Sequence, residues 1–167
     1  MQLPYFILVF VYGAIFGSFF NVVILRLPKN ESLIHQSSHC PNCMTPIKAY
    51  DLIPIISYIF LGGKCRSCKH KISIRYPLIE LLTAITLTFV FYRFGFSYES
   101  LIGFILTSVL IIVAMIDIDT MEIYDRFQII LLAIALLNLF ISPLPILDHF
   151  IGFFIISIPF YIIAYLT

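Results

Sequence analysis

The sequence predicts an all-α, multi-pass membrane protein with about five transmembrane helices and a small cytoplasmic insert that is like a zinc ribbon. Apolar residues make up 61% of the 167 residues, charged residues only 11%, and the mean hydropathy is +1.05. A soluble domain carries about 25% charged residues. Apolar runs long enough to cross a bilayer also recur along the chain. A water-soluble globule and a disordered chain are therefore excluded.

The apolar runs divide the chain into three predicted parts. Residues 1–25 contain no charged side chain and predict a first transmembrane helix. We expect this helix to be retained, because a signal peptide carries its cations before the apolar run and here they follow it. Residues 26–76 form a polar insert, expected to bind zinc. Residues 77–167 predict a four-helix membrane region, with apolar segments at 77–92, 101–116, 127–141 and 150–166.

The charge distribution predicts the orientation in the membrane. Eight of the ten Lys and Arg residues lie between residues 26 and 76, together with only two acids. Cations collect in cytoplasmic loops, so we expect the N-terminus outside, and the insert and the connector 117–126 inside. The lipid bilayer is thus one expected partner. No nucleic-acid partner is expected, because topology already accounts for the positive charge.

All four cysteines lie in the insert, in two C-x2-C pairs separated by 21 residues. Each pair puts two sulfurs on one tight turn, and two such turns complete a tetrahedron around Zn²⁺. The expected ligands of this structural zinc are Cys40, Cys43, Cys65 and Cys68. Two disulfides or four buried thiols are the alternatives, and disulfides are disfavoured on the cytoplasmic side. His39 and His70 flank the pairs and are alternative ligands.

Acidic residues at the ends of apolar segments are candidates for function, because charge is costly in a membrane. Asp117 ends the third apolar segment, Asp125 begins the fourth, and Glu80 lies one turn into the second. Two carboxylates that share a proton activate water for peptide hydrolysis. We therefore take these three acids as candidates for a catalytic site.

The acids other than Asp117 also have structural alternatives. Asp125 is equally well placed to cap a helix. Asp119 is expected to be a solvated residue of the connector. Glu80 has Arg75 or a neighbouring helix as an alternative partner, and Asp148 is expected to cap the last helix. Three classes of protein remain open on this evidence: an intramembrane hydrolase, a zinc-bearing membrane scaffold, and a transporter with an acid relay.

Several short motifs follow one another along the chain. They are Gly17-Ser18-Phe19-Phe20-Asn21-Val22, Arg26-Leu27-Pro28, the two C-x2-C pairs, Ile53-Pro54-Ile55 with Ser57-Tyr58, Leu61-Gly62-Gly63-Lys64-Cys65 and Tyr76-Pro77-Leu78-Ile79-Glu80. Together they resemble the N-terminal half of bacterial prepilin peptidases, the bifunctional leader peptidases and N-methyltransferases of type IV pilus, type II secretion and competence systems. The resemblance covers essentially the whole chain.

The resemblance implies an activity, a cofactor and a location. Such enzymes are intramembrane aspartic proteases of the bacterial cytoplasmic (inner) membrane. They cut the basic leader of type IV prepilin or pseudopilin precursors on the cytoplasmic side and methylate the new N-terminus with S-adenosylmethionine. Asp117 matches the first catalytic aspartate of the family. Asp125 matches the aspartate of a Pro-Asp step, although Tyr124 replaces the proline. Asp125 and Glu80 are expected to support Asp117.

The family's second catalytic aspartate lies in a Gly-x-Gly-Asp segment after the fifth helix. The 167 residues contain no such segment. We therefore expect the chain to be truncated before it, or to be completed by a C-terminal half or a second chain. The alternative is an inactive zinc-bearing membrane scaffold, or a half-enzyme that needs a partner chain.

Overall fold

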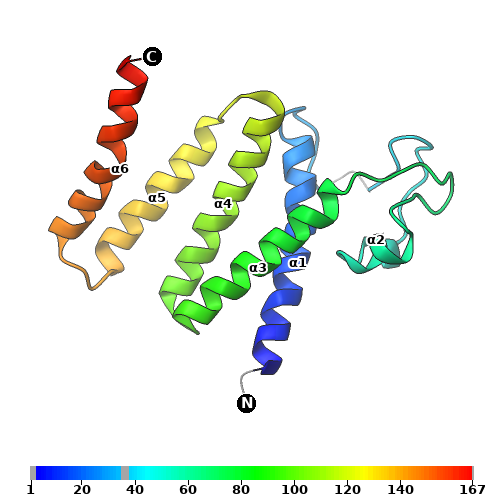
Figure 1. Ribbon diagram of the computed structural model, residues 1–167, viewed down its shortest axis with the longest axis horizontal. Coiled ribbons are helices and arrows are strands. Elements are labelled where there is room, and N and C mark those ends of the chain that lie inside the picture. The colour runs from blue at the N-terminus through cyan, green and yellow to red at the C-terminus, as the bar shows by residue number, and fades with distance from the viewer. Residues whose placement is uncertain (1–2, 35–37, 167) are drawn as a thin grey trace. The chain divides into compact units, whose positions relative to one another are not determined.

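The structure is a computed structural model that describes residues 3–34 and 38–166 (Figure 1). The described residues form six α-helices, one 3-10 helix and no strand, with two isolated β-bridges. In chain order the elements are α1 (Leu3–Arg26), η1 (Ala49–Leu52), α2 (Ile56–Phe60), α3 (Arg75–Phe94), α4 (Tyr98–Thr120), α5 (Asp125–Ile141) and α6 (Ile146–Leu166). The chain divides into two compact units, Met1–Phe127 and Gln128–Thr167.

Four helices among the described residues are long and apolar enough to cross a membrane. They are α1, α3, α4 and the part of α6 from Ile146 to Ile163. Helix α5 has 17 residues, at the lower end of the range for a spanning helix. The predicted all-α, multi-pass membrane fold is therefore confirmed.

Two predicted helix boundaries were wrong. The connector was predicted to begin at Asp117, but α4 continues to Thr120. Met121 adopts the left-handed conformation, and its N–H donates to the Asp117 carbonyl oxygen, 2.8 Å away, which ends the helix. Similarly, Asp148 does not cap the last helix, because α6 already begins at Ile146 and Asp148 is its third residue. Polar residues extend a helix beyond the apolar segment, and hydropathy alone does not detect that extension.

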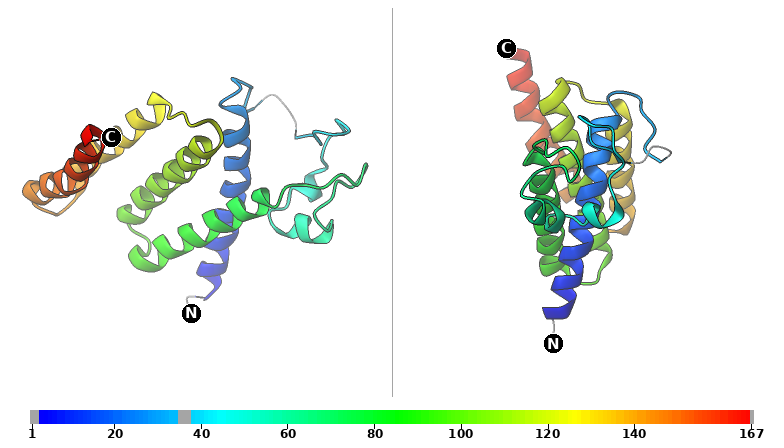
Figure 2. Two further views of the ribbon diagram at one scale, coloured as in Figure 1. Left: turned by 45° about the horizontal axis from the view of Figure 1, so that its top comes forward. Right: turned by 90° about the vertical axis from the view of Figure 1, so that its right-hand side faces the viewer.

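Helices α1 and α3 cross in direct backbone contact (Figure 2). A Cβ added to Gly13 would lie 2.6 Å from Ala84 Cα, and a Cβ added to Gly17 would lie 2.6 Å from Glu80 Cα. Glycines four residues apart present a flat strip on which a second transmembrane helix packs closely. One turn further along α1, the buried Asn21 side chain donates a hydrogen bond to the Tyr76 carbonyl oxygen, 3.1 Å away. The crossing therefore fixes the first half of α3.

Helix α4 returns antiparallel to α3 after a tight turn. Gly95 ends α3 with a positive φ of 63°, which a glycine adopts without steric cost. The Ser97 hydroxyl then accepts a hydrogen bond from the Ser100 N–H and caps α4. Because the two helices are antiparallel neighbours, the first turn of α3 and the last turn of α4 lie at the same end of the bundle (Figure 1).

We expect Gly17→Ala to destabilise the chain by about 1–3 kcal/mol, because the new methyl group would overlap the α3 backbone. The matched control is Gly152→Ala in α6, where no heavy atom lies within 4 Å of the added Cβ. This control should keep or slightly raise stability, because alanine favours helix over glycine. Thermal unfolding in detergent micelles would measure both. An equal loss at the two positions would contradict the close crossing of α1 and α3.

Candidate functional site

The four cysteines of the insert converge on one point. Their sulfur atoms all lie within 4.8 Å of one another, and none of them forms a disulfide. The Cys40 and Cys68 sulfurs are 3.8 Å apart, and the Cys43 and Cys65 sulfurs are 4.0 Å apart. A Zn–S distance of about 2.3 Å places sulfurs about 3.8 Å apart at the corners of a tetrahedron. The four residues therefore fit a zinc ion, and no described histidine belongs to the group.

Each cysteine pair sits on the same turn, so the repeat seen in the sequence is also a repeat of conformation. In both turns the N–H of the first cysteine donates to the carbonyl of the residue five positions later, and the residue four positions later donates back to the first cysteine. These bonds are Cys40–Thr45 at 3.0 Å, Met44–Cys40 at 2.9 Å, Cys65–His70 at 2.8 Å and Lys69–Cys65 at 3.0 Å. The turns need a left-handed residue at Met44 and Lys69, with φ of 55° and 59°.

The turns also change the acidity of the thiols. Hydrogen bonding with the Thr45 side chain lowers the pKa of Cys43 to about 6. Hydrogen bonds from the Cys68 and Ser67 backbone lower the pKa of Cys65. For the buried Cys40, backbone hydrogen bonds lower the pKa, but burial and the neighbouring sulfurs outweigh them and raise it. Because the thiolate is the form that binds a metal, the turns favour metal binding at Cys43 and Cys65.

Two neighbours of the cysteines were missed by the sequence analysis. The Asn42 side-chain amide donates to the Cys68 sulfur, 3.6 Å away, and so joins the two turns. Arg66 donates two hydrogen bonds to Asp51, of 2.8 and 2.6 Å, and tethers η1 to the second turn. This pairing lowers the pKa of Asp51. The position of Asn42 between two cysteines was the available signal, whereas nothing local marks the Arg66–Asp51 pair.

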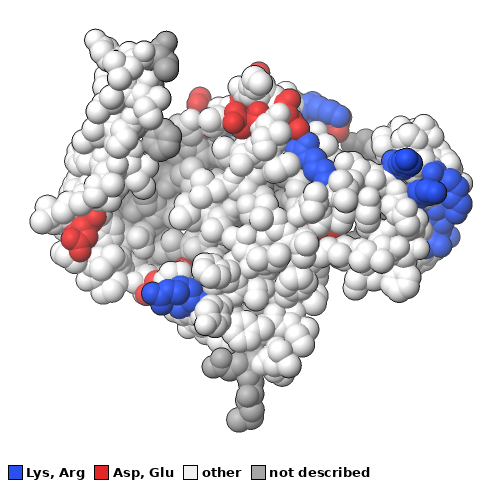
Figure 3. Space-filling view, in the orientation of Figure 1, with Lys and Arg blue, Asp and Glu red and all other residues white. Residues whose placement is uncertain are grey.

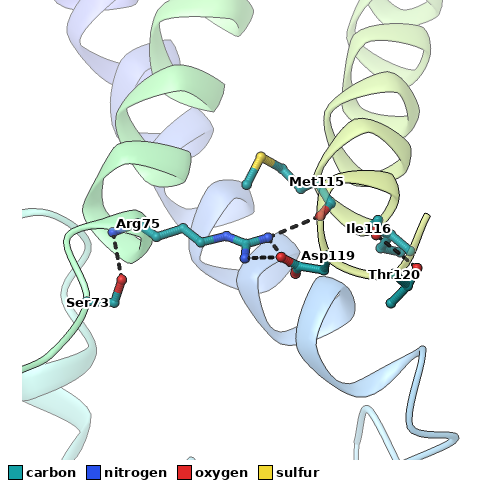
Figure 4. A network of polar contacts seen from close by, with 6 residues as sticks. All are labelled: Ser73, Arg75, Met115, Ile116, Asp119 and Thr120. Atoms are coloured by element: carbon teal, nitrogen blue, oxygen red, sulfur yellow. Dashed lines mark hydrogen bonds and ion pairs between the residues drawn. The ribbon is translucent and has the colours of Figure 1, made fainter. Parts of the chain in front are cut away.

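At the start of α3, Arg75 forms a clamp with the end of α4 (Figure 4). Its guanidinium group donates two hydrogen bonds to the Asp119 carboxylate, of 2.5 and 2.7 Å, and a third to the Met115 carbonyl oxygen, of 3.1 Å. Asp119 is therefore exposed as expected, but it lies in α4 and not in the connector, and Arg75 pairs with Asp119 instead of Glu80. The two side chains are 30% and 29% exposed, as expected at a membrane surface.

Asp117 lies in the last turn of α4, two residues before the clamp. Its side chain is exposed and forms no ion pair with a described residue. The structure thus brings Asp117 close to Asp119 and Arg75 along the chain, but leaves its carboxylate open to solvent at the end of a membrane-length helix. Such a carboxylate is able to accept a proton from water.

Glu80 and Asp125, the two supporting candidates, lie in different surroundings. Glu80 is buried against α1, only 8% exposed, and accepts a hydrogen bond of 2.7 Å from the Ile55 N–H of the insert. Ile55 holds this N–H in place with an unusual φ of 61°. Asp125 is exposed and is the first residue of α5, so it is not the N-cap residue. Its negative charge there interacts favourably with the positive end of the helix dipole and stabilises the start of α5.

The clamp is expected to couple α3 and α4 energetically. Arg75→Gln or Asp119→Asn should each cost about 1 kcal/mol, the upper range for an exposed ion pair. The exchanged pair Arg75→Asp with Asp119→Arg should recover part of that loss, since it restores opposite charges. Arg93→Gln at the other end of α3 is the control and should be near neutral. Thermal unfolding of these variants in micelles, together with the single variants Arg75→Asp and Asp119→Arg, tests this. A loss in the exchanged pair equal to the sum of those two single losses would contradict the clamp.

Comparison with known proteins identifies the family. A family model described as the Bacterial Peptidase A24 N-terminal domain matches residues 11–94. Three proteins named prepilin leader peptidase/N-methyltransferase are similar to the chain. That of Neisseria gonorrhoeae is 40% identical over 76% of this chain and 53% of its own length. That of Bacillus subtilis is 41% identical over 82% and 55%, and that of Klebsiella pneumoniae 39% identical over 86% and 66%.

The chain matches only part of the length of these relatives. The chain spans about half the length of the first curated relatives it matches. No solved structure matches the chain. The family model nevertheless covers the close helix crossing, both cysteine pairs and the whole of α3, which are the features described above. The chain therefore belongs to the family of the bacterial peptidase A24 N-terminal domain.

Proposed function

We propose that this chain is the N-terminal part of a membrane-embedded aspartic peptidase that cleaves the leaders of type IV prepilins or pseudopilins and methylates the new N-terminus. The family and the printed names of the relatives support this proposal. In it, residues 1–25 and 77–167 lie in the bacterial cytoplasmic membrane, and residues 26–76 form a zinc-binding insert on the cytoplasmic side.

The observation that carries the proposal is the place of Asp117 at the exposed end of α4. An aspartic peptidase needs two carboxyl groups that share a proton, so that one takes a proton from water while the other donates one to the scissile carbonyl. We assign the first role to Asp117. By the family resemblance, the second carboxyl comes from a Gly-x-Gly-Asp segment, supplied by a C-terminal half or a second chain.

The Arg75–Asp119 clamp supports placing Asp117 on the same side as the insert. Arg75 is where the insert enters the membrane helix α3, and the clamp holds that point next to the last turn of α4. The cations of the insert favour the cytoplasm, so Asp117 would face the cytoplasm too. A basic prepilin leader would then meet an open carboxylate at the membrane surface.

Zinc has a structural role in this proposal. The four sulfurs leave no open position for a substrate or a water molecule, so the metal would hold the insert folded. A segment of about 50 residues buries too little apolar surface to fold firmly without such a support. For the methylation step the family resemblance implies S-adenosylmethionine as methyl donor, and we assign no described residue to it.

We expect the purified chain to hold about one zinc ion, as a closed four-sulfur site requires. Cys43→Ser and Cys68→Ser should lose the metal and unfold the insert, because zinc contributes about 10–16 kcal/mol to folding in zinc-finger peptides. His70→Ala should keep it. Metal analysis and limited proteolysis of the insert measure both effects. An insert that resists proteolysis without metal would contradict the structural role.

The catalytic assignment is tested after joining the chain to the C-terminal half of the Bacillus subtilis relative. The joined protein should cleave a prepilin peptide, and Asp117→Asn should reduce the rate by about 10²–10⁴-fold, because the amide takes up no proton. Asp148→Asn is the matched control and should be near normal. Asp125→Asn measures the supporting role.

Mass spectrometry of the cleaved peptide gives the rate and the cleavage position in this experiment. The chain alone is expected to cleave poorly. A zinc-bearing scaffold would give no cleavage in any combination. Cleavage that survives Asp117→Asn would show that another acid is the base.

A further inference from the structure

The insert contains an apolar stretch that its zinc-binding role does not explain. Residues 52–63 carry no charged side chain, although the segment 26–76 around them holds eight cations. The stretch includes the end of η1 and the whole of α2, and it lies between the two cysteine turns. A cytoplasmic loop exposed to water has no evident need for twelve successive uncharged residues.

The apolar side chains of this stretch point outward. Ile56, Ile59 and Phe60 occupy one face of α2, at positions i, i+3 and i+4. Ile59 is 69% exposed and Phe60 is 84% exposed. Leu52 and Ile53 extend this exposed surface along the chain. We call the surface made by Leu52, Ile53, Ile56, Ile59 and Phe60 the apolar face. Exposed apolar patches of this kind mark contacts with a protein or a membrane.

The opposite side of α2 is tied to the cysteine turns. The Tyr58 hydroxyl donates a hydrogen bond of 3.3 Å to the Ile72 carbonyl oxygen, and Ile72 follows the second turn. The Ser57 hydroxyl donates to the Ile53 carbonyl oxygen, 2.6 Å away, which satisfies a polar group within the segment itself. Tyr58 thus ties α2 to the second cysteine turn, whereas Ile59 and Phe60 stay exposed among the described residues.

The depth of this segment is fixed by its contact with α3. The Ile55 N–H donates to the Glu80 carboxylate, 2.7 Å away. Glu80 follows Arg75 by five residues, which at 1.5 Å per residue is about 7.5 Å along the helix. We take the partly exposed ion pair of Arg75 and Asp119 as the level of the membrane surface. Figure 1 shows α2 beside the first part of α3. Interfacial helices bury their apolar face about 5–10 Å into the boundary of headgroups and acyl chains.

The charges of the insert are placed in keeping with such a depth. In Figure 3 one group of Lys and Arg side chains lies at the outer edge of the insert, and further cations lie at the end of the helix bundle, where Arg26 ends α1 and Arg75 begins α3. Cations within the range of anionic headgroups attract a module to the membrane surface. The insert therefore combines an apolar side at membrane depth with a basic side farther out.

We propose that residues 52–61 are an interfacial membrane anchor, with the apolar face inserted among the acyl chains of the lipid leaflet beside α3. The zinc-binding insert then lies against the membrane surface and is held there by three contacts: the Glu80–Ile55 hydrogen bond, the apolar face and the basic edge. This inference concerns lipid contact alone and does not depend on the proposed peptidase activity.

The absence of tryptophan from the chain provides a direct test. The full chain carrying Phe60→Trp is reconstituted into vesicles of phosphatidylcholine and phosphatidylglycerol, with ordinary or brominated acyl chains. Met44→Trp is the matched control, since Met44 is similarly exposed, at 63%, but lies on the first cysteine turn. Phe89→Trp, at an exposed position of α3, reports contact with acyl chains. Zinc content confirms that each variant is folded.

The proposal predicts that Phe60→Trp behaves like Phe89→Trp. Its emission should be blue-shifted, should fall strongly in brominated lipid, and should resist aqueous acrylamide. Met44→Trp should show the reverse on all three measurements. The proposal is overturned if Phe60→Trp is quenched by acrylamide and not by brominated lipid. It is equally overturned if neither reagent quenches Phe60→Trp, because the apolar face would then be covered by protein, such as a second copy of the chain.

Discussion

The close contact of α1 and α3 at Gly13 and Gly17 is the constraint on which the rest of the Met1–Phe127 unit depends. Between two apolar helices in lipid there is no hydrophobic drive to associate, so shape and polar contacts must hold them. The glycines supply the shape, and the Asn21–Tyr76 hydrogen bond supplies a polar contact one turn away. Because the insert is the loop between these two helices, their crossing also fixes both of its ends.

Two polar contacts transmit this arrangement to the candidate sites. Glu80, whose backbone meets Gly17, receives the Ile55 N–H and so holds the insert beside α3. Arg75, at the start of α3, donates two hydrogen bonds to the Asp119 carboxylate and so holds the end of α4. The insert and the last turn of α4 are thus positioned by the same first turns of one helix. A shift of α3 would move both together, which suits a site that acts at the junction of membrane and insert.

The sequence predicted the features that depend on local pattern. Hydropathy located the membrane helices, and each C-x2-C spacing located one cysteine turn, because both are set by neighbouring residues. The two turns could be placed together, although Cys40 and Cys68 lie 28 positions apart, because one zinc ion needs four ligands. The sequence did not predict the Arg75–Asp119 pair, whose members lie 44 positions apart, or the Ile55–Glu80 bond, 25 positions apart. Such pairs depend on how helices cross. The catalytic role of Asp117 and the division of the chain into domains stay predictions.

The conformation of Ile55 gives the insert a mechanical property. A β-branched residue at a φ of 61° is a rare outlier, and such a residue costs about 1–3 kcal/mol that surrounding contacts must offset. Here the offsetting contact is the hydrogen bond to a buried carboxylate. The hydrogen bond thus ties a strained turn of the insert to a buried carboxylate of α3, so the backbone strain at Ile55 is stored at the junction between the insert and the membrane helix.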